Sequence, residues 1–235
     1  MKKIIAQIYN FIIFLSLLES FIFIRSSNAF FPRINEPNKK ELKSTSIQIG
    51  KTAIQLIHFG QNNEAIKLLE LAIKLNPQEK TLWLSLAEAQ IRSNKKIQAI
   101  SSLNKAIKLN PEEENIYFSK ASIYMDLNDP QKAKKSIQKG LLINKNNAKG
   151  YFYLGNAEIM LNNYESALIA FRKSSKIDSD FWQSINNEGL ILYELNKSKE
   201  AIEKFRTALK ISNNAEPMLA LAIVLFTLNN NSIES

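Results

Sequence analysis

One periodicity constrains the fold of this chain more than any other feature of its sequence. An alanine recurs five times at intervals of 34 residues, and a large apolar residue follows each alanine four positions later. The alanines are Ala65, Ala99, Ala133, Ala167 and Ala201, and the large residues are Leu69, Leu103, Ile137, Phe171 and Phe205. A fixed period of this length indicates a solenoid built from repeated supersecondary units.

Two further positions of each repeat continue the same pattern. A small residue occupies the first of them, at Ala72, Ala106, Gly140, Ser174 and Ala208, and an aliphatic residue occupies the second, at Leu75, Leu109, Ile143, Ile177 and Ile211. The offsets of four, three and three residues follow one face of an α-helix. Small side chains allow two helices to cross closely. We therefore expect each repeat to end in a tightly packed helix.

A second helix precedes this one in each repeat, and a turn separates the two. The preceding helix is marked at one register by Trp83, Tyr117, Tyr151 and Ile185. The turns are marked by residues that tolerate a left-handed backbone, namely Gly60, Asn94, Asn128, Asn162, Asn196 and Asn230. Pro77 and Pro111 end the first two repeats, and Asp129 before Pro130 predicts a capped helix start.

This combination of alanines, turn residues and prolines resembles the tetratricopeptide repeat family. The resemblance implies an all-α fold, a right-handed superhelical solenoid of antiparallel helix pairs with five full repeats plus a sixth first helix. The predicted repeats are 46–79, 80–113, 114–147, 148–181, 182–215 and a partial repeat 216–235, which together form a domain over 46–235. The sequence departs mildly from the family, because Lys145, Ser179 and Asn213 replace its proline.

The first 29 residues differ in character from the rest of the chain. Lys2 and Lys3 precede an apolar stretch over residues 4–24, and Ala29 supplies a small residue where a signal peptidase cuts. Three interpretations stay open for residues 1–29, and the first two involve a membrane. They form a signal peptide that is removed after Ala29, or a membrane anchor, since about 20 apolar residues can cross a bilayer.

Glu19 lies inside the apolar stretch and favours the signal peptide. A carboxylate at the centre of a membrane span costs about 2.5 to 3.5 kcal/mol, which weakens a permanent anchor more than a transient signal. A buried N-terminal helix is the third alternative. The first two predict an exported or membrane-associated domain outside the cytoplasm, in a periplasm or a thylakoid lumen. Residues 30–45, with Pro32, Pro37 and several charges, are expected to be a linker.

Composition excludes several kinds of chemistry. The chain has no cysteine and its single histidine is His58, so neither a cysteine nucleophile nor a two-histidine metal site can form. It also lacks a glycine-rich phosphate loop and a nucleophile elbow. We expect no enzyme activity, no cofactor and no metal. The net charge of +9 raises nucleic acid as a partner, but the lysines alternate with Glu and Asn along outward faces, so we expect no nucleic-acid binding.

Candidate binding residues follow from the resemblance, which implies that the first helix of each repeat lines a concave groove. The expected groove residues are Leu84, Glu88, Arg92, Phe118, Ser122, Asp126, Phe152, Asn156, Met160, Asn186, Leu190 and Glu194. This apolar and aromatic track with polar edges suits an extended peptide or a partner helix. The amides of Asn156 and Asn186 are expected to hold a peptide backbone. A Lys/Arg clamp for a terminal carboxylate is missing, so acidic C-terminal peptides are not expected ligands.

Two other groups of residues carry expectations of their own. Phe181 and Trp182, at a repeat junction, are expected either to pack between repeats or to anchor a partner. Lys120, Glu158 and Glu188 face the first-helix core. Each of these three could pair across neighbouring repeats, but we expect partial exposure with the apolar stem covered.

The sequence therefore predicts a protein-binding scaffold or assembly factor whose partner it does not identify. The chain resembles small N-terminally membrane-targeted tetratricopeptide proteins of photosynthetic bacteria, some of which assist photosystem assembly. The alternative is a structural spacer or a homo-oligomer. It rests on helix 216–228, whose apolar residues are too many to hide on one face, so self-association or partner docking is expected there.

Overall fold

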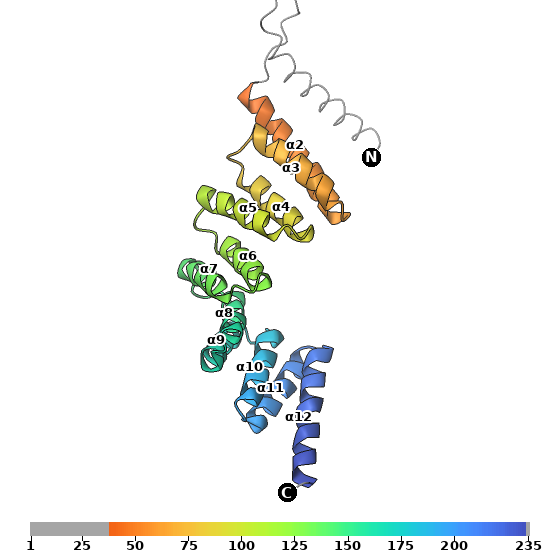
Figure 1. Cartoon of the computed structure of the whole chain (residues 1–235), viewed down its shortest axis with the longest axis vertical. Helices are drawn as coiled ribbons and strands as arrows, with labels where there is room; N and C mark the ends of the chain where they lie inside the picture. The colour runs from red at the N-terminus through yellow and green to blue at the C-terminus, as the bar shows by residue number, and fades with distance from the viewer. Residues whose placement is uncertain (1–37, 234–235) are drawn as a thin grey trace, which may run out of the picture. The chain divides into compact units, whose positions relative to one another are not determined.

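The computed structural model describes residues 38–233, which form eleven helices and no strand (Figure 1). The first helices of the pairs are α2 (Lys39–His58), α4 (Lys80–Arg92), α6 (Glu114–Asp126), α8 (Ala148–Met160) and α10 (Trp182–Glu194). The second helices are α3 (Asn62–Leu75), α5 (Lys96–Leu109), α7 (Pro130–Ile143), α9 (Tyr164–Ile177) and α11 (Ser198–Ile211). The last helix is α12 (Ala215–Ile233).

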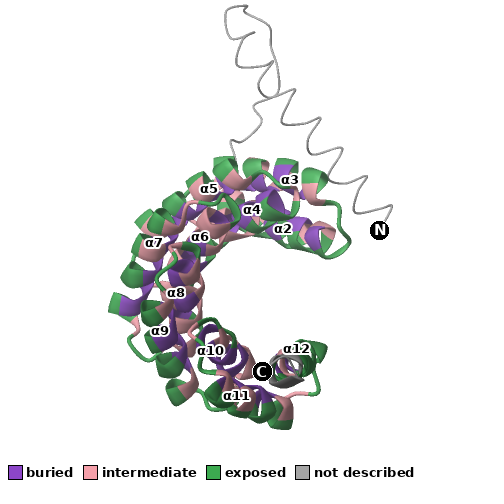
Figure 2. Ribbon diagram, turned by 60° about the horizontal axis from the view of Figure 1, so that its bottom comes forward, coloured by how far each residue is buried: buried purple, intermediate pink, exposed green. Residues whose placement is uncertain are grey.

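Within the unit Lys39–Ser235, each first helix packs against its own second helix, and that second helix packs against the first helix of the next pair. Figure 2 shows the first helices along the inner side of this row and the second helices along its outer side. The helix α12 packs on α11 and also contacts α10, as a sixth first helix should. The predicted all-α solenoid of five helix pairs and a sixth first helix is confirmed.

The predicted turn residues adopt the left-handed backbone, with one exception. Gly60 has a φ of 76°, and Asn94, Asn128, Asn162 and Asn196 have φ between 56° and 60°. After α4, for example, the Asn94 N–H donates to the Ile91 carbonyl and the Lys95 N–H donates to the Gln90 carbonyl, which satisfies two carbonyls at the helix end. Asn230 was wrongly predicted as a turn, because α12 continues through it to Ile233 without a Gly or Pro to end the helix.

The first described helix overlaps the segment 30–45 that was predicted as a linker. The helix α2 begins at Lys39, so residues 39–45 are helical, because no proline or glycine follows Pro37 until Gly50. The segment 1–29 and the cleavage position after Ala29 lie outside the described residues. Among the described helices, none combines the length and apolar character that a membrane span needs.

The core shows why large and small residues alternate between paired helices. Phe171 and Phe205 are fully buried in α9 and α11. A Cβ added to Gly155 would lie 2.5 Å from the Phe171 ring, and one added to Gly189 would lie 2.7 Å from the Phe205 ring. In an earlier repeat the shorter Leu103 shares its cluster with Ala87. The first helix therefore carries a residue small enough for the side chain that the second helix presses against it.

Candidate partner-binding surface

The predicted groove residues separate into two sets in the structure. The first residue of each predicted triplet lies between helices, with Phe118 and Asn186 buried and Leu84 and Phe152 half-buried. The later residues stay accessible, with Glu88, Arg92, Asp126, Met160, Leu190 and Glu194 exposed and Ser122 and Asn156 half-buried. A residue four positions along a helix lies about 40° further round the helix axis. The third residue of a triplet therefore lies about 80° from the first, which moves it from the packed side of the helix to the accessible side.

Phe118 does not face the groove, which corrects the prediction. Its side chain is 3% exposed and packs where three helices meet. Added Cβ atoms on Gly140 of α7 and Gly150 of α8 would lie 2.6 and 2.7 Å from the ring. The two glycines therefore make the space that the ring fills.

Phe152 and Asn186 also lie further inside than predicted. The Phe152 ring contacts the rings of Tyr153, Phe171 and Phe181, with centroids 6.0, 6.0 and 5.2 Å away. Asn186 is buried and its Oδ1 atom accepts no hydrogen bond within the described residues. Its amide is therefore not presented to a peptide backbone as expected.

A cleft of about 460 Å³ lies between α4 and α6, on the side where the groove was expected. Leu84, Ile91 and Ile116 contribute apolar surface to it. Glu88 and Arg92, also in its wall, form an ion pair in which the Arg92 Nη2 atom lies 2.9 Å from the Glu88 Oε1 atom. The cleft therefore combines an apolar floor with a charged rim.

Two ion pairs join the repeats that form this cleft. Lys80 at the start of α4 pairs with Glu113, the residue that precedes α6. Lys96 of α5 lies 3.7 Å from a carboxylate oxygen of Asp126, and also donates to the Asp126 main-chain carbonyl. Since both pairs join successive repeats, they fix the spacing of the helices that line the cleft. Asp126 thus has a structural partner besides any binding role.

Sequence reasoning did not include Ile91, Asn115 and Ser119 among the cleft residues, although all three line it. The signal was present, because a 34-residue repeat places Met125, Ile159 and Tyr193 at the register of Ile91. This apolar register lies one residue before the predicted third position. It was missed because the predicted stripe followed steps of four residues only.

The remaining predicted residues lie further along the row of helices. The Asn187 Nδ2 atom donates to the Asn156 Oδ1 atom at 3.1 Å, which leaves the Asn156 NH₂ group for a partner carbonyl. Phe181, the residue before α10, packs on Phe152 of α8. Trp182 begins α10 and is half-buried. Whether these residues bind a partner stays a prediction.

The two buried glutamates pair across helices, which corrects the expectation of partial exposure. Glu188 is 1% exposed, and its carboxylate lies 3.0 Å from the Arg172 Nε atom of α9 and 3.0 Å from the Lys204 Nζ atom of α11. Glu158 is buried as well and lies 2.7 Å from the Lys134 Nζ atom of α7. A carboxylate is tolerated at such burial because cations face it. These pairs join neighbouring helices and take no part in the cleft.

Comparisons with known proteins agree with this architecture. Sequence models of the tetratricopeptide repeat match residues 56–123, 114–147 and 183–214, which together make up more than half of the chain. No curated protein matches it at a significant level.

Solved structures are similar at low sequence identity. The crystal structure of MamA protein is 22% identical, with a TM-score of 0.65 over 73% of this chain and 92% of that chain. YrrB, described as a tetratricopeptide protein with an unusual peptide-binding site, is 18% identical, with a TM-score of 0.61 over 76% of this chain and 91% of that chain. A tetratricopeptide repeat protein from Parabacteroides merdae is 19% identical, with a TM-score of 0.71 over 80% and 75%. At these identities the likeness shows the fold alone.

Proposed function

Because the chain belongs to the tetratricopeptide repeat family, whose fold is that of a protein–protein interaction scaffold, we propose that it binds an extended segment of a partner protein on its concave surface. The observation that carries this proposal is the cleft between α4 and α6. Its volume falls within the range of about 300 to 1,000 Å³ that ligand sites occupy. In this role the protein serves as a scaffold or assembly factor.

The character of the cleft favours a peptide with apolar side chains. Ile91 is 37% exposed although it lies among other apolar residues of the cleft, so a partner side chain can cover it. The rim charges are already paired with each other, as Glu88 with Arg92 and Lys80 with Glu113. A strongly charged ligand therefore gains little here, and apolar contact supplies most of the affinity. YrrB offers a structural relative for which a peptide-binding site is described.

A matched pair of substitutions tests this role. Ile91→Lys places a charge in the cleft, and Ile169→Lys places the same charge on α9, where the native side chain is 67% exposed. Full-length variants are used as bait in extracts of the native host. A partner that is captured by wild type and Ile169→Lys but lost with Ile91→Lys supports the proposal. Equal capture by all three proteins contradicts it.

As part of this proposal the domain works outside the cytoplasm, which the apolar residues 4–24 and the small residue Ala29 support. Mass spectrometry of the protein isolated from its host tests the proposal. A mature chain that starts at Phe30 agrees with a cleaved signal peptide. A full-length species confined to the membrane fraction indicates an anchor instead, and a full-length soluble species contradicts export.

A second candidate function rests on α12. Met218, Leu219, Ile223, Leu225 and Phe226 are all exposed within the described residues, and Phe226 is 66% exposed. Over residues 215–229 of this helix, only Pro217 and Val224 are buried. A group of exposed apolar side chains on one helix suits association with a second copy, which makes the protein a homo-oligomer or spacer. Sedimentation over a range of concentrations distinguishes this candidate, because a strict monomer excludes it.

A further inference from the structure

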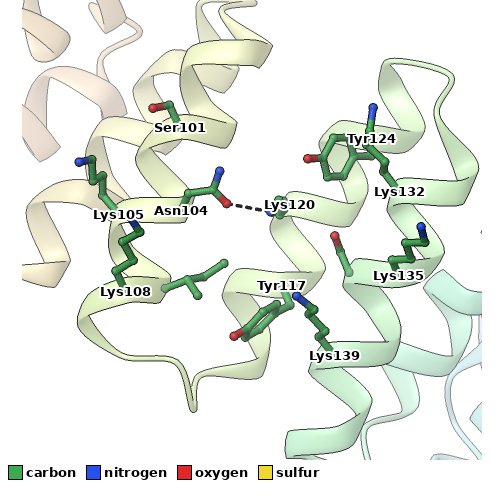
Figure 3. Close-up of a pocket in the computed structure, with 12 residues that line it drawn as sticks. Ser101, Asn104, Lys105, Lys108, Tyr117, Lys120, Tyr124, Lys132, Lys135 and Lys139 are labelled. Atoms are coloured by element: carbon green, nitrogen blue, oxygen red, sulfur yellow. Dashed lines mark hydrogen bonds between the residues drawn. The ribbon is translucent and has the colours of Figure 1, made fainter.

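A second cleft, of about 610 Å³, lies between α5 and α7 with α6 at its base (Figure 3). Six lysines from these three helices line it: Lys105, Lys108, Lys120, Lys132, Lys135 and Lys139. None of its lining residues is an aspartate or a glutamate. Of the glutamates and asparagines expected to alternate with lysines along outward faces, this cleft contains only Asn104.

Most of these lysines lack a carboxylate partner among the described residues. Lys132 pairs with Asp129, 2.6 Å away, and Lys120 donates to the Asn104 Oδ1 atom at 2.7 Å. Ion pairs formed within residues 38–229 include none of the other four. The cleft thus holds several positive charges, and among them only Lys132 forms a close ion pair within the described residues.

The electrostatics of Lys120 reflect this imbalance. Burial lowers the pKa of its ammonium group, and the positive charge of Lys139 lowers that pKa further. Its Nζ atom lies 5.7 Å from the centre of the Tyr124 ring. A like charge and partial burial both act against the protonated form, so a bound anion would relieve the repulsion.

We propose that this lysine cleft binds an acidic peptide segment of a partner protein, at a site separate from the concave cleft. Lys132, Lys135 and Lys139 follow one face of α7 over seven residues, a length of about 10 Å. An extended peptide advances about 3.3 Å per residue, so about three or four residues span this row. Lys105 and Lys108 of α5 line the opposite wall of the cleft.

The aromatic residues in the cleft favour a peptide over nucleic acid. The Tyr124 ring already has two cations near it. In addition to Lys120, the Lys132 Nζ atom lies 5.8 Å from the ring centre. The Tyr117 hydroxyl donates to the Pro111 carbonyl, which fixes the second ring. Binding of single-stranded nucleic acid relies on free aromatic faces for stacking. Carboxylates need only the ammonium groups, which the cleft supplies.

The test measures binding of a fluorescent oligoglutamate of about ten residues, long enough to span the cleft, to the full-length protein by fluorescence anisotropy. The variant K135Q/K139Q removes two charges from the cleft. The control K67Q/K74Q removes two exposed lysines of α3, which form no ion pair within the described residues. Because Lys and Gln have similar helix propensity, both variants keep the fold, and circular dichroism verifies this.

We expect K135Q/K139Q to raise the Kd for oligoglutamate about tenfold and the control to raise it less than about twofold. I91Q changes the concave cleft without changing the net charge and should leave this Kd unchanged, which separates the lysine cleft from the concave surface. Carbodiimide crosslinks between peptide carboxylates and the protein should map to the lysines of the cleft.

Three results would overturn the proposal. The first is an equal loss of affinity in both double variants, which means that net charge alone attracts the peptide. The second is wild-type binding of oligoglutamate no tighter than that of oligoglutamine. The third is tighter binding of an oligothymidylate than of an oligoglutamate of equal length, which assigns the cleft to nucleic acid.

Discussion

The contact between Phe118 and Gly140 allows a test of the packing. The substitution Gly140→Ala should change the stability in opposite directions when the Phe118 ring is present and when it is absent. Gly140 is a helical position where the three atoms nearest to an added Cβ all belong to the Phe118 ring, with Cε1 at 2.6 Å and Cζ at 2.9 Å. Gly140→Ala is therefore expected to destabilise the wild type. In Phe118→Ala the ring is gone, so the same substitution should stabilise the protein.

The magnitudes follow from burial. Phe118→Ala removes about 100 Å² of buried apolar surface, which is worth about 2.5 kcal/mol, and the cavity raises the loss to about 3 to 5 kcal/mol. In the wild type, Gly140→Ala destabilises the protein by about 1 to 3 kcal/mol through overpacking. The higher helix propensity of alanine offsets about 1 kcal/mol of this loss. In the Phe118→Ala background only the propensity gain remains. We therefore expect a coupling free energy of about 1 to 3 kcal/mol between the two sites.

Urea unfolding of the four proteins, followed by far-UV circular dichroism, measures this cycle. Gly140→Ala should lower the unfolding midpoint of the wild type and raise that of Phe118→Ala. Additive effects, within about 0.5 kcal/mol, would refute the packing described for Phe118. A small effect of Phe118→Ala alone would instead show that the side chain faces solvent.

Three further predictions concern separate features. Glu188→Gln should lower the free energy of unfolding by about 1 to 3 kcal/mol in the urea assay. The reason is that it weakens two ion pairs of a carboxylate that is 1% exposed, while the cations stay partly solvated. Glu88→Gln, which weakens an exposed ion pair, should lower it by under about 0.5 kcal/mol. Asn94→Ala should cost about 1 kcal/mol in thermal unfolding, because alanine tolerates a φ of 58° poorly, whereas Asn94→Gly should cost nothing. Leu225→Lys should abolish any concentration-dependent association seen by sedimentation, and unchanged association would exclude α12 as the contact.

The fold was predictable because its evidence repeats five times along the chain. The alanines at 34-residue intervals are all fully buried, and four of the five observed left-handed turns are formed by asparagines at the same interval. Each repeat carries the same sequence pattern, so an atypical residue in one repeat does not hide the period. Asn230 shows the limit, because the asparagine alone does not end a helix.

The side-chain environments were less predictable because they depend on contacts between helices. Steps of four residues placed Phe118 and Asp126 on one stripe of α6, yet the rotation along the helix leaves the first buried and the second exposed. Glu188 meets Arg172 and Lys204 at 16 residues on either side, a spacing that no single helix makes adjacent. The lysine cleft was missed for the same reason, because its lysines come from three helices of two repeats.

The central claim is that the concave surface binds a partner protein, and crosslinking in the native host tests it most directly. A photoreactive amino acid is placed at Ser119, which lines the cleft between α4 and α6, and in a second strain at Ile169 on α9. We predict a crosslinked partner from position 119 that is absent from position 169. Crosslinks of equal yield from both positions, or from position 169 alone, would contradict the claim.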